Sequence, residues 1–273
     1  MPPDPFIGTT QWSRIDRELD AIAGSHGVRI LLAVESGSRA WRFPSSDSDY
    51  DVRFIYQHPA DSYLSIEPPP DTIDAADAGL LDINGWDIRK ALRMAVRSNA
   101  VLLEWLASPV RYRDAGTTPT RLLALARESC HLPAIEYHYD RLARHSFAAI
   151  ASSEEPVRLK AYCYALRAAL ALQWLRRHGA PPPMDVPSLL DGLVVADGRR
   201  QAIASLIARK ASATERDVAA RLPLLDSLIE ETLAQLVDRA ALPDRAPVLA
   251  KADAFFAALV RAGWPPDDTG RRP

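Results

Sequence analysis

The sequence predicts an α+β protein in which a small mixed β-sheet is followed by an α-helical bundle. Short apolar runs bounded by Gly, Pro, Ser or Asp are concentrated in the first third of the chain, a pattern typical of strands and turns. Afterwards apolar residues recur at intervals of three and four, which is typical of amphipathic helices. With 48% apolar and 25% charged residues, the composition is that of a folded globular protein.

The individual elements follow from these patterns. Ile15, Leu19 and Ile22 share one helical face, so we expect a helix over 12–23 before the sheet. Strands are expected at 29–34, 52–56 and 80–83, and Ala- and Leu-rich helices around 122–126, 159–175, 206–208, 218–236 and 248–260. The chain is thereby divided into a sheet domain over 1–115, a helical domain over 116–264 and a frayed tail over 265–273.

Charge and cysteine usage exclude several classes of protein. A net charge of -2 gives no molecule-wide basic field, so any contact with nucleic acid needs a local patch. Cys130 and Cys163 are too few for a disulfide scaffold and lack zinc-ligand spacing. The sequence has no signal-like start and no apolar run of roughly 18 residues, so we expect a cytoplasmic protein outside the membrane.

The segment over 34–56 carries the most chemical information. Its first strand runs into Gly37-Ser38, and its second strand begins at Asp49-Tyr50-Asp51. Residues two apart in a strand project from the same face, so Asp49 and Asp51 would present two carboxylates side by side to a hard cation. This pair predicts a metal site.

The turn before the carboxylates is suited to an anion. Gly37 lets the backbone approach a phosphate, Ser38 offers a hydroxyl, and a turn into a short helix would expose backbone N–H groups. Arg39 or Arg42 would add positive charge. Phosphoryl and nucleotidyl transfer need this combination of metal-binding carboxylates and phosphate donors.

The spacing of these motifs resembles a known superfamily. Gly-Ser, ten residues and then Asp-x-Asp on a strand is similar to the signature of the DNA polymerase β nucleotidyltransferase superfamily. The strings GSRAW, DSDYDVR, DINGWDIRKAL and EWLASP resemble its RNA-ligase-associated branch, a group of predicted nucleotidyltransferases linked to RNA repair. The resemblance covers roughly residues 28 to 110 and implies that the sheet domain is palm-like.

The resemblance also implies a third carboxylate on a neighbouring strand. Asp82 lies in the apolar context of such a residue and is our first choice as the third catalytic metal ligand, with Asp49 and Asp51. Asp87 is the alternative, but it lies where a helix should begin, and helix capping explains an acid there equally well.

The resemblance implies the cofactor and substrates as well. Three carboxylates would hold two Mg²⁺ or Mn²⁺ ions about 3.5 to 4 Å apart, which would bind a nucleoside triphosphate and activate the attacking hydroxyl. ATP is the expected triphosphate. The expected acceptor is an RNA end, with a protein or a small molecule as alternatives, and the oligomeric state stays open.

Two helical faces offer further contacts to the substrate. Lys160, Tyr164 and Arg167 share a face on which a base could stack while the cations approach phosphates. Arg89, Arg93 and Arg97 form a basic stripe that could contact triphosphate or RNA, and a solvated face explains this stripe equally well. We therefore assign nucleotide contacts to Gly37, Ser38, Arg39, Lys160, Tyr164 and Arg167.

Other conspicuous side chains have structural interpretations. Arg53 follows the carboxylates and is expected to pair with one of them. The face formed by His138, Arg141 and His145 is more typical of structure than of catalysis. Trp86, Trp105 and Trp174 lie in apolar surroundings and are expected in the core.

Two further functions use the same sequence. A transferase that AMPylates a protein, as in antitoxin-like enzymes, would use the same three acids. A noncatalytic nucleotide- or RNA-binding protein would keep the fold and lose the metal ligands, which the presence of Gly37, Ser38, Asp49 and Asp51 argues against.

Overall fold

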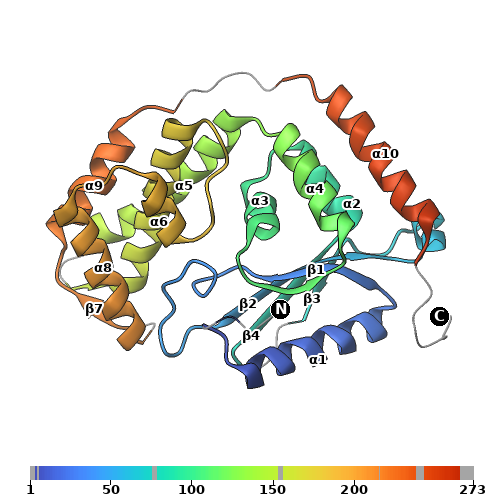
Figure 1. Ribbon diagram of the computed structural model, residues 1–273, viewed down its shortest axis with the longest axis horizontal. Helices are drawn as coiled ribbons and strands as arrows, with labels where there is room; N and C mark the ends of the chain where they lie inside the picture. Colours follow the sequence, from blue (N-terminus) through green and yellow to red (C-terminus); the bar gives the residue numbers. More distant parts are fainter. Residues whose placement is uncertain are drawn as a thin grey trace. The chain divides into compact units, whose positions relative to one another are not determined.

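The computed structural model divides into two compact units (Figure 1). Its described residues are 4, 6–75, 79–152, 156–214, 216–237 and 243–264. The first unit, which we call the sheet unit, comprises Met1–Ser36, Tyr50–Ser129 and Asp244–Pro273, and the second, the helical unit, comprises Gly37–Asp49 and Cys130–Pro243. The predicted frayed tail over 265–273 lies outside the described residues.

A five-stranded mixed sheet organises the sheet unit, with the strand order β3-β4-β2-β1-β5. β2 and β4 are parallel, whereas the other neighbouring pairs are antiparallel. The α+β class and the mixed sheet are therefore as predicted. The strands are β1 (Arg29–Glu35), β2 (Tyr50–Gln57), β3 (Thr72–Asp74), β4 (Leu81–Asp87) and β5 (Arg111–Asp114).

The two edge strands were not predicted from the sequence. β3 has only three residues, and β5 reads Arg-Tyr-Arg-Asp with a single buried side chain. Neither presents the apolar run that signals a strand, because each is stabilised by pairing with one neighbour rather than by burial of both faces.

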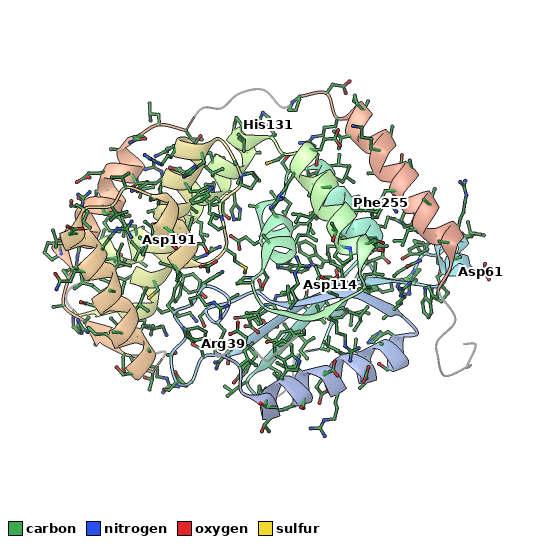
Figure 2. The ribbon with its side chains drawn as sticks, in the orientation of Figure 1. Arg39, Asp61, Asp114, His131, Asp191 and Phe255 are labelled. Atoms are coloured by element: carbon green, nitrogen blue, oxygen red, sulfur yellow. The ribbon has the colours of Figure 1, made fainter. Side chains whose placement is uncertain are left out.

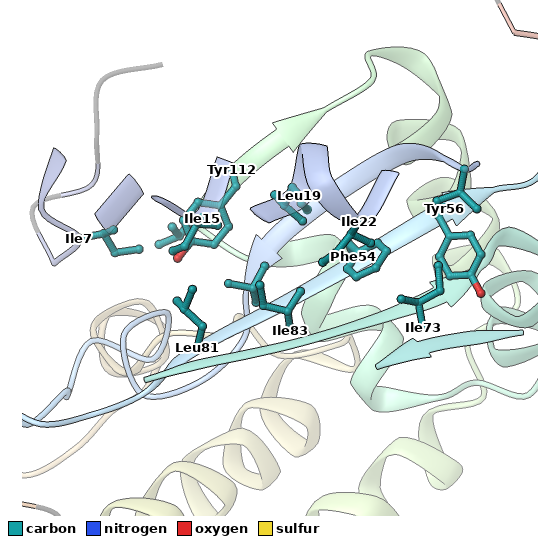
Figure 3. Close-up of a cluster of buried hydrophobic side chains, with 14 residues drawn as sticks. Ile7, Ile15, Leu19, Ile22, Phe54, Tyr56, Ile73, Leu81, Ile83 and Tyr112 are labelled. Carbon is teal, nitrogen blue, oxygen red and sulfur yellow. The ribbon is translucent and has the colours of Figure 1, made fainter. Parts of the chain in front are cut away.

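Helix α1 (Thr9–His26) covers one face of the sheet (Figure 3). Its residues Ile15, Leu19 and Ile22 are buried, as their spacing predicted, and pack in one cluster with Phe54 and Ile83 from the sheet. The helix ends at Gly27, whose φ of 58° is the left-handed conformation that glycine adopts without strain. This core fixes the sheet that carries the predicted carboxylates.

The opposite face of the sheet is covered by further helices of the same unit (Figure 1). α10 packs against α2, and α4 contacts α2, α3 and β1. The helices are α2 (Ile88–Val96), α3 (Ala100–Ala107), α4 (Thr117–Glu128) and α10 (Ala246–Ala262), with a 3-10 turn at Ala60–Leu64.

The helical unit is built around α6 (Leu159–His178), which contacts α5, α7, α8 and α9. Twelve of its residues are buried, including Arg167, so its apolar surface is nearly continuous. The expected helix over 218–236 begins only at Pro223, because Val218–Ala219 pairs as strand β7 with β6, Val157–Arg158. The other helices are α5 (Leu132–Ala151), α7 (Val186–Gly192), α8 (Asp197–Ser212) and α9 (Pro223–Ala234).

The boundary between the two units does not fall after residue 115, where the sequence analysis placed the end of the sheet domain. α4 and α10 follow that position in the chain but pack with the sheet unit, since their apolar faces are buried there. The segment Gly37–Asp49 lies between two strands of the sheet in sequence and packs with the helical unit. Long-range packing, rather than sequence order, decides the membership of these segments.

Candidate functional site

Asp51 and Asp82 lie side by side on the sheet. They are register partners in the parallel pair formed by β2 and β4. Along each strand, partly buried and buried residues alternate at this position, so both carboxylates leave the same face, opposite Val52 and Ile83. The sheet thus brings together two acids that are 31 positions apart in the chain.

Arg53 bridges the two carboxylates. Its Nη2 donates to Asp82 Oδ2 at 2.7 Å and to Asp51 Oδ1 at 3.3 Å, and its Nη1 donates to the Asp82 carbonyl oxygen at 2.9 Å. The predicted pairing of Arg53 with one carboxylate is therefore confirmed and extends to both. Because the Arg53 guanidinium contacts both carboxylates, the two side chains are close enough for one small cation to bind to both.

The acid pair remains accessible. The side chains of Asp51 and Asp82 are 29% and 47% exposed, whereas that of Arg53 is 18% exposed. The carboxylates can therefore meet a ligand from solvent without unfolding of the strands. Among the described residues, no group of three or more His, Cys, Asp or Glu side chains is arranged to hold a metal ion.

Asp87 occupies the other end of β4 and has a different environment. It pairs in register with Tyr56, five residues from Asp82, which corresponds to about 16 Å along a strand. Its Oδ1 accepts from the backbone N–H of Arg89 at 2.7 Å and caps α2, while its Oδ2 accepts from the Tyr63 hydroxyl at 2.8 Å. Asp87 is therefore fully engaged in structure and distant from Asp51.

Glu35 supports the acid pair from within the core, and our interpretation of the sequence did not single it out. Its side chain is fully buried, accepts from the backbone N–H of Asp51 at 2.9 Å and accepts from the Tyr112 hydroxyl at 2.6 Å. A buried acid at the end of an apolar strand is the signal that could have identified it, because such a group needs a partner.

In the helical unit, Gly37 and Ser38 begin a compact loop (Figure 2 labels Arg39 within it). The backbone N–H of Trp41 donates to the Gly37 carbonyl and that of Phe43 to the Ser38 carbonyl, both at 3.0 Å, so consecutive turns replace the expected short helix. Arg42 adopts a φ of 70°, which ends any helical continuation. Gly37 and Ser38 are both buried in this loop.

Arg39 closes the same loop. Its Nη2 donates to the Ser48 carbonyl at 2.7 Å and its Nε to the Asp49 carbonyl at 3.3 Å, and the residue is only 8% exposed. These bonds join the start of the segment Gly37–Asp49 to its end. The guanidinium predicted to contact phosphate thus holds the backbone of Asp49, whose side chain is exposed.

A buried lysine anchors the middle of the loop. Lys210 on α8 is 1% exposed and donates to the Ser45 hydroxyl at 2.9 Å. Ser45 in turn donates its backbone N–H to Ser48 Oγ at 2.9 Å. Helix α8 of the helical unit therefore fixes a loop whose sequence lies between two strands of the sheet, a link that periodicity cannot predict.

The predicted face of α6 contacts the loop as well. Trp41 and Tyr164 meet edge to face with ring centroids 5.0 Å apart, and the Arg167 guanidinium lies 4.4 Å from the Trp41 ring. Arg167 is buried and donates to the Met184 carbonyl at 3.0 Å, whereas Lys160 is exposed, 5.7 Å from the Tyr164 ring. Tyr164 and Arg167 thus contact the loop through Trp41. All six predicted nucleotide contacts belong to the helical unit: Gly37, Ser38, Arg39, Lys160, Tyr164 and Arg167.

The remaining conspicuous residues have simpler environments. Trp86 and Trp105 stack on each other with centroids 4.1 Å apart, and Trp105 is buried. Arg141 and His145 are exposed on α5. Arg93 on α2 and Arg97, the residue that follows the end of this helix, are exposed.

Comparison with known proteins assigns the chain to a family. The model of the RNA repair pathway DNA polymerase beta family matches residues 12–258, and the chain belongs to this family. A Bacillus subtilis (strain 168) protein, "Uncharacterized protein YcgL", is 43% identical over 227 residues, which cover 83% of this chain and 87% of that protein. The family resemblance expected from the motifs around Gly37-Ser38 and Asp49-Tyr50-Asp51 is confirmed.

Among solved structures, a nucleotidyltransferase-like protein from Exiguobacterium sibiricum 255-15 is similar with a TM-score of 0.33 and 12% identity, covering 92% of this chain and 81% of that one. Among the described residues, no helix combines the length and apolar character needed to cross a membrane.

Proposed function

We propose that the protein is a metal-dependent nucleotidyltransferase, which transfers a nucleoside monophosphate from a nucleoside triphosphate to an acceptor hydroxyl. Membership of a polymerase β family linked to RNA repair supports the reaction class and favours an RNA end as acceptor. The observation that carries the proposal is the register pairing of Asp51 with Asp82 on one accessible face of the sheet. ATP is the proposed triphosphate.

The acid pair suits a divalent cation such as Mg²⁺ or Mn²⁺. Carboxylate oxygens are the ligands these hard ions prefer, and Mg²⁺ commonly needs only one or two carboxylates besides water and substrate phosphates. Arg53 already places a cation against both acids, which supports a site with affinity for positive charge. When bound, the metal would neutralise the triphosphate and lower the pKa of the attacking hydroxyl.

Asp49 is the proposed third ligand. Chain geometry keeps its Cα within about 7 Å of that of Asp51, because only one residue separates them. Arg39 holds the Asp49 carbonyl, so the exposed carboxylate starts from a fixed backbone. One of the three acids would also accept the proton of the attacking hydroxyl.

The loop and α6 would contact the nucleotide. Gly37 and Ser38 are proposed to place backbone N–H groups near the phosphates. Exposed Lys160 would meet a phosphate, and Tyr164 would stack against the base. Arg39 and Arg167 would support these contacts indirectly by holding the loop. The Arg39 guanidinium is buried against the Ser48 carbonyl, and that of Arg167 against the Trp41 ring.

Incubation with each α-labelled nucleoside triphosphate, Mg²⁺ or Mn²⁺, and separate RNA and protein acceptors tests the proposal. We expect labelled RNA and released pyrophosphate with the wild type, and loss of both in Asp51→Ala and Asp82→Ala. Asp61→Ala removes an exposed acid of the same unit and should retain transfer. Label on protein instead would indicate the AMPylating alternative, and nucleotide binding without transfer would indicate a binding protein.

A further inference from the structure

A cavity lies at the end of the parallel strands β2 and β4 that is opposite to Asp51 and Asp82. It has a volume of about 160 Å³ and is lined by His58, Tyr63, Asp71, Asp87, Arg89 and Arg93, together with two prolines. β2 ends at Gln57 and β4 at Asp87, directly before α2. Asp51 lies six residues back along β2, which corresponds to about 20 Å, so this cavity is separate from the acid pair.

His58 presents an unused polar atom in this cavity. The residue is 9% exposed, its ring contacts Tyr56 and Tyr63 edge to face, and its Nε2 has no hydrogen-bond partner among the described residues. Tyr63 and Asp87 are fully used by comparison, because the Tyr63 hydroxyl joins the His58 backbone N–H to Asp87. A buried ring nitrogen without a partner is unfavourable unless a ligand supplies one.

Two cations complete the lining. Arg89 and Arg93 lie one turn apart on α2, and neither forms an ion pair with an acid in the described part of the chain. The Arg89 guanidinium is held over the rings of Tyr63 and Phe256, at 4.8 and 5.4 Å from their centroids. Asp71 forms an ion pair with Lys90 at 3.5 Å, and Asp87 accepts hydrogen bonds from the Tyr63 hydroxyl and the backbone N–H of Arg89, so neither carboxylate pairs with the guanidinium groups of Arg89 and Arg93.

We propose that this cavity binds the phosphoryl group of a small ligand, with Arg89 and Arg93 contacting its oxygens and a proton shared between His58 Nε2 and one oxygen. Guanidinium groups match the geometry of phosphoryl oxygens, and the volume admits a phosphoryl group but not a nucleoside. The group is either free phosphate or the end of a phosphomonoester.

An adjoining cavity favours a phosphomonoester over free phosphate as the ligand. Arg89 and Arg93 also line a space of about 200 Å³ between α2 and α10, whose other walls are mainly apolar and include one acid: Leu92, Val96, Leu249, Ala252, Asp253 and Phe256. The apolar part of a phosphomonoester could occupy this space while its phosphoryl group lies beside His58. Free phosphate would leave it unused.

Calorimetric titration of the full chain with inorganic phosphate and with phenyl phosphate tests the proposal, together with ¹⁵N spectra of the His58 imidazole, assigned with His58→Gln. We expect one or both probes to bind and to shift the His58 signal, with tighter binding of phenyl phosphate if the natural ligand is a monoester. Arg93→Ala should weaken binding about tenfold. Arg97→Ala, which removes the exposed arginine directly after the end of α2, should leave it unchanged.

Three results would overturn the proposal: no binding of either probe, binding without a shift of the His58 signal, or equal weakening by Arg97→Ala. Because the spectral readout is local to His58, phosphate bound at the Gly37-Ser38 loop cannot imitate it. The outcome is also independent of nucleotidyl transfer.

Discussion

Arg53 holds together two carboxylates that would otherwise repel each other. Replacing it with alanine should lower the free energy of unfolding by about 1 kcal/mol without divalent ions, since these charges are partly exposed and screened. The same variant should bind Mn²⁺ more tightly, because a competing cation has been removed. Chemical denaturation with and without Mn²⁺ measures both effects.

Arg113 provides the matched control for this prediction. It pairs with Asp16 and Asp20 on α1 at 2.7 and 2.8 Å, in the same unit but away from Asp51. Arg113→Ala should also reduce stability, while its Mn²⁺ affinity should equal that of the wild type. Weaker Mn²⁺ binding in Arg53→Ala would show that Arg53 orients the acids rather than competing for them.

His58 makes stability dependent on pH. Burial lowers the pKa of His58 below its usual value of 6.5, the Asp87 charge and a hydrogen bond with the Pro70 backbone raise it by less, and the Arg89 charge lowers it slightly further. As the pH falls, the His58 imidazole therefore becomes protonated in the unfolded chain at a higher pH than in the folded protein. The free energy of unfolding should consequently fall as the pH drops from about 7.5 to 5.5. His58→Gln should show a smaller decrease over this interval in denaturant titrations, and an identical decrease would contradict the assignment.

Single residues also show what the sequence could predict. Asp51 and the capping role of Asp87 were inferred from local patterns, since strand alternation and helix starts are local properties, whereas Asp82 was chosen through the family resemblance. Glu35 and Lys210 were missed, because their partners lie 16 and 165 positions away in the chain. Only the fold reveals why these buried charged residues are present.

At the scale of elements, the pairing of β2 with β4 depends on close packing at Gly85. A Cβ atom at this position would lie 2.2 Å from Phe54 Cζ, closer than atoms can approach. Gly85→Ala should therefore destabilise the protein by roughly 1–3 kcal/mol. Gly24→Ala, on α1 with nothing within 4 Å of its added Cβ, should be neutral or stabilising in the same denaturation assay.

A second variant distinguishes steric overlap from a change in backbone freedom. Phe54→Leu removes the ring that an alanine at 85 would meet, so the double variant should lose less stability than the sum of the single variants. Additive losses would contradict the contact between Gly85 and Phe54.

The loop Gly37–Asp49 is an element held by side chains rather than by regular backbone bonds. Lys210→Met keeps the length of the side chain and removes the bond from Nζ to the Ser45 hydroxyl. Amide hydrogen exchange at Ser45 should then become faster by about tenfold or more, because the loop opens more often. Lys251→Met, an exposed lysine on α10, is the control, and equal exchange in both variants would contradict the anchoring role.

At the scale of the whole molecule, the sequence predicted the α+β class and the family but not the division into units. α10 and α4 have helical patterns that say nothing about which partner their apolar faces cover. The loop 37–49 has no regular pattern at all, and its membership follows from Arg39, Lys210 and Trp41. Periodicity identifies elements, whereas specific long-range contacts assemble them.

Asp51 and Asp82 together form the proposed cation site. Mn²⁺ can be titrated into the wild type and into Asp51→Asn, Asp82→Asn and Asp61→Asn, with electron paramagnetic resonance as the readout, because bound and free Mn²⁺ give distinct signals. We predict bound Mn²⁺ in the wild type and in Asp61→Asn, and at least a tenfold loss of affinity in each of the other two. Undiminished Mn²⁺ binding in Asp51→Asn and Asp82→Asn would show that these two carboxylates are not the metal site.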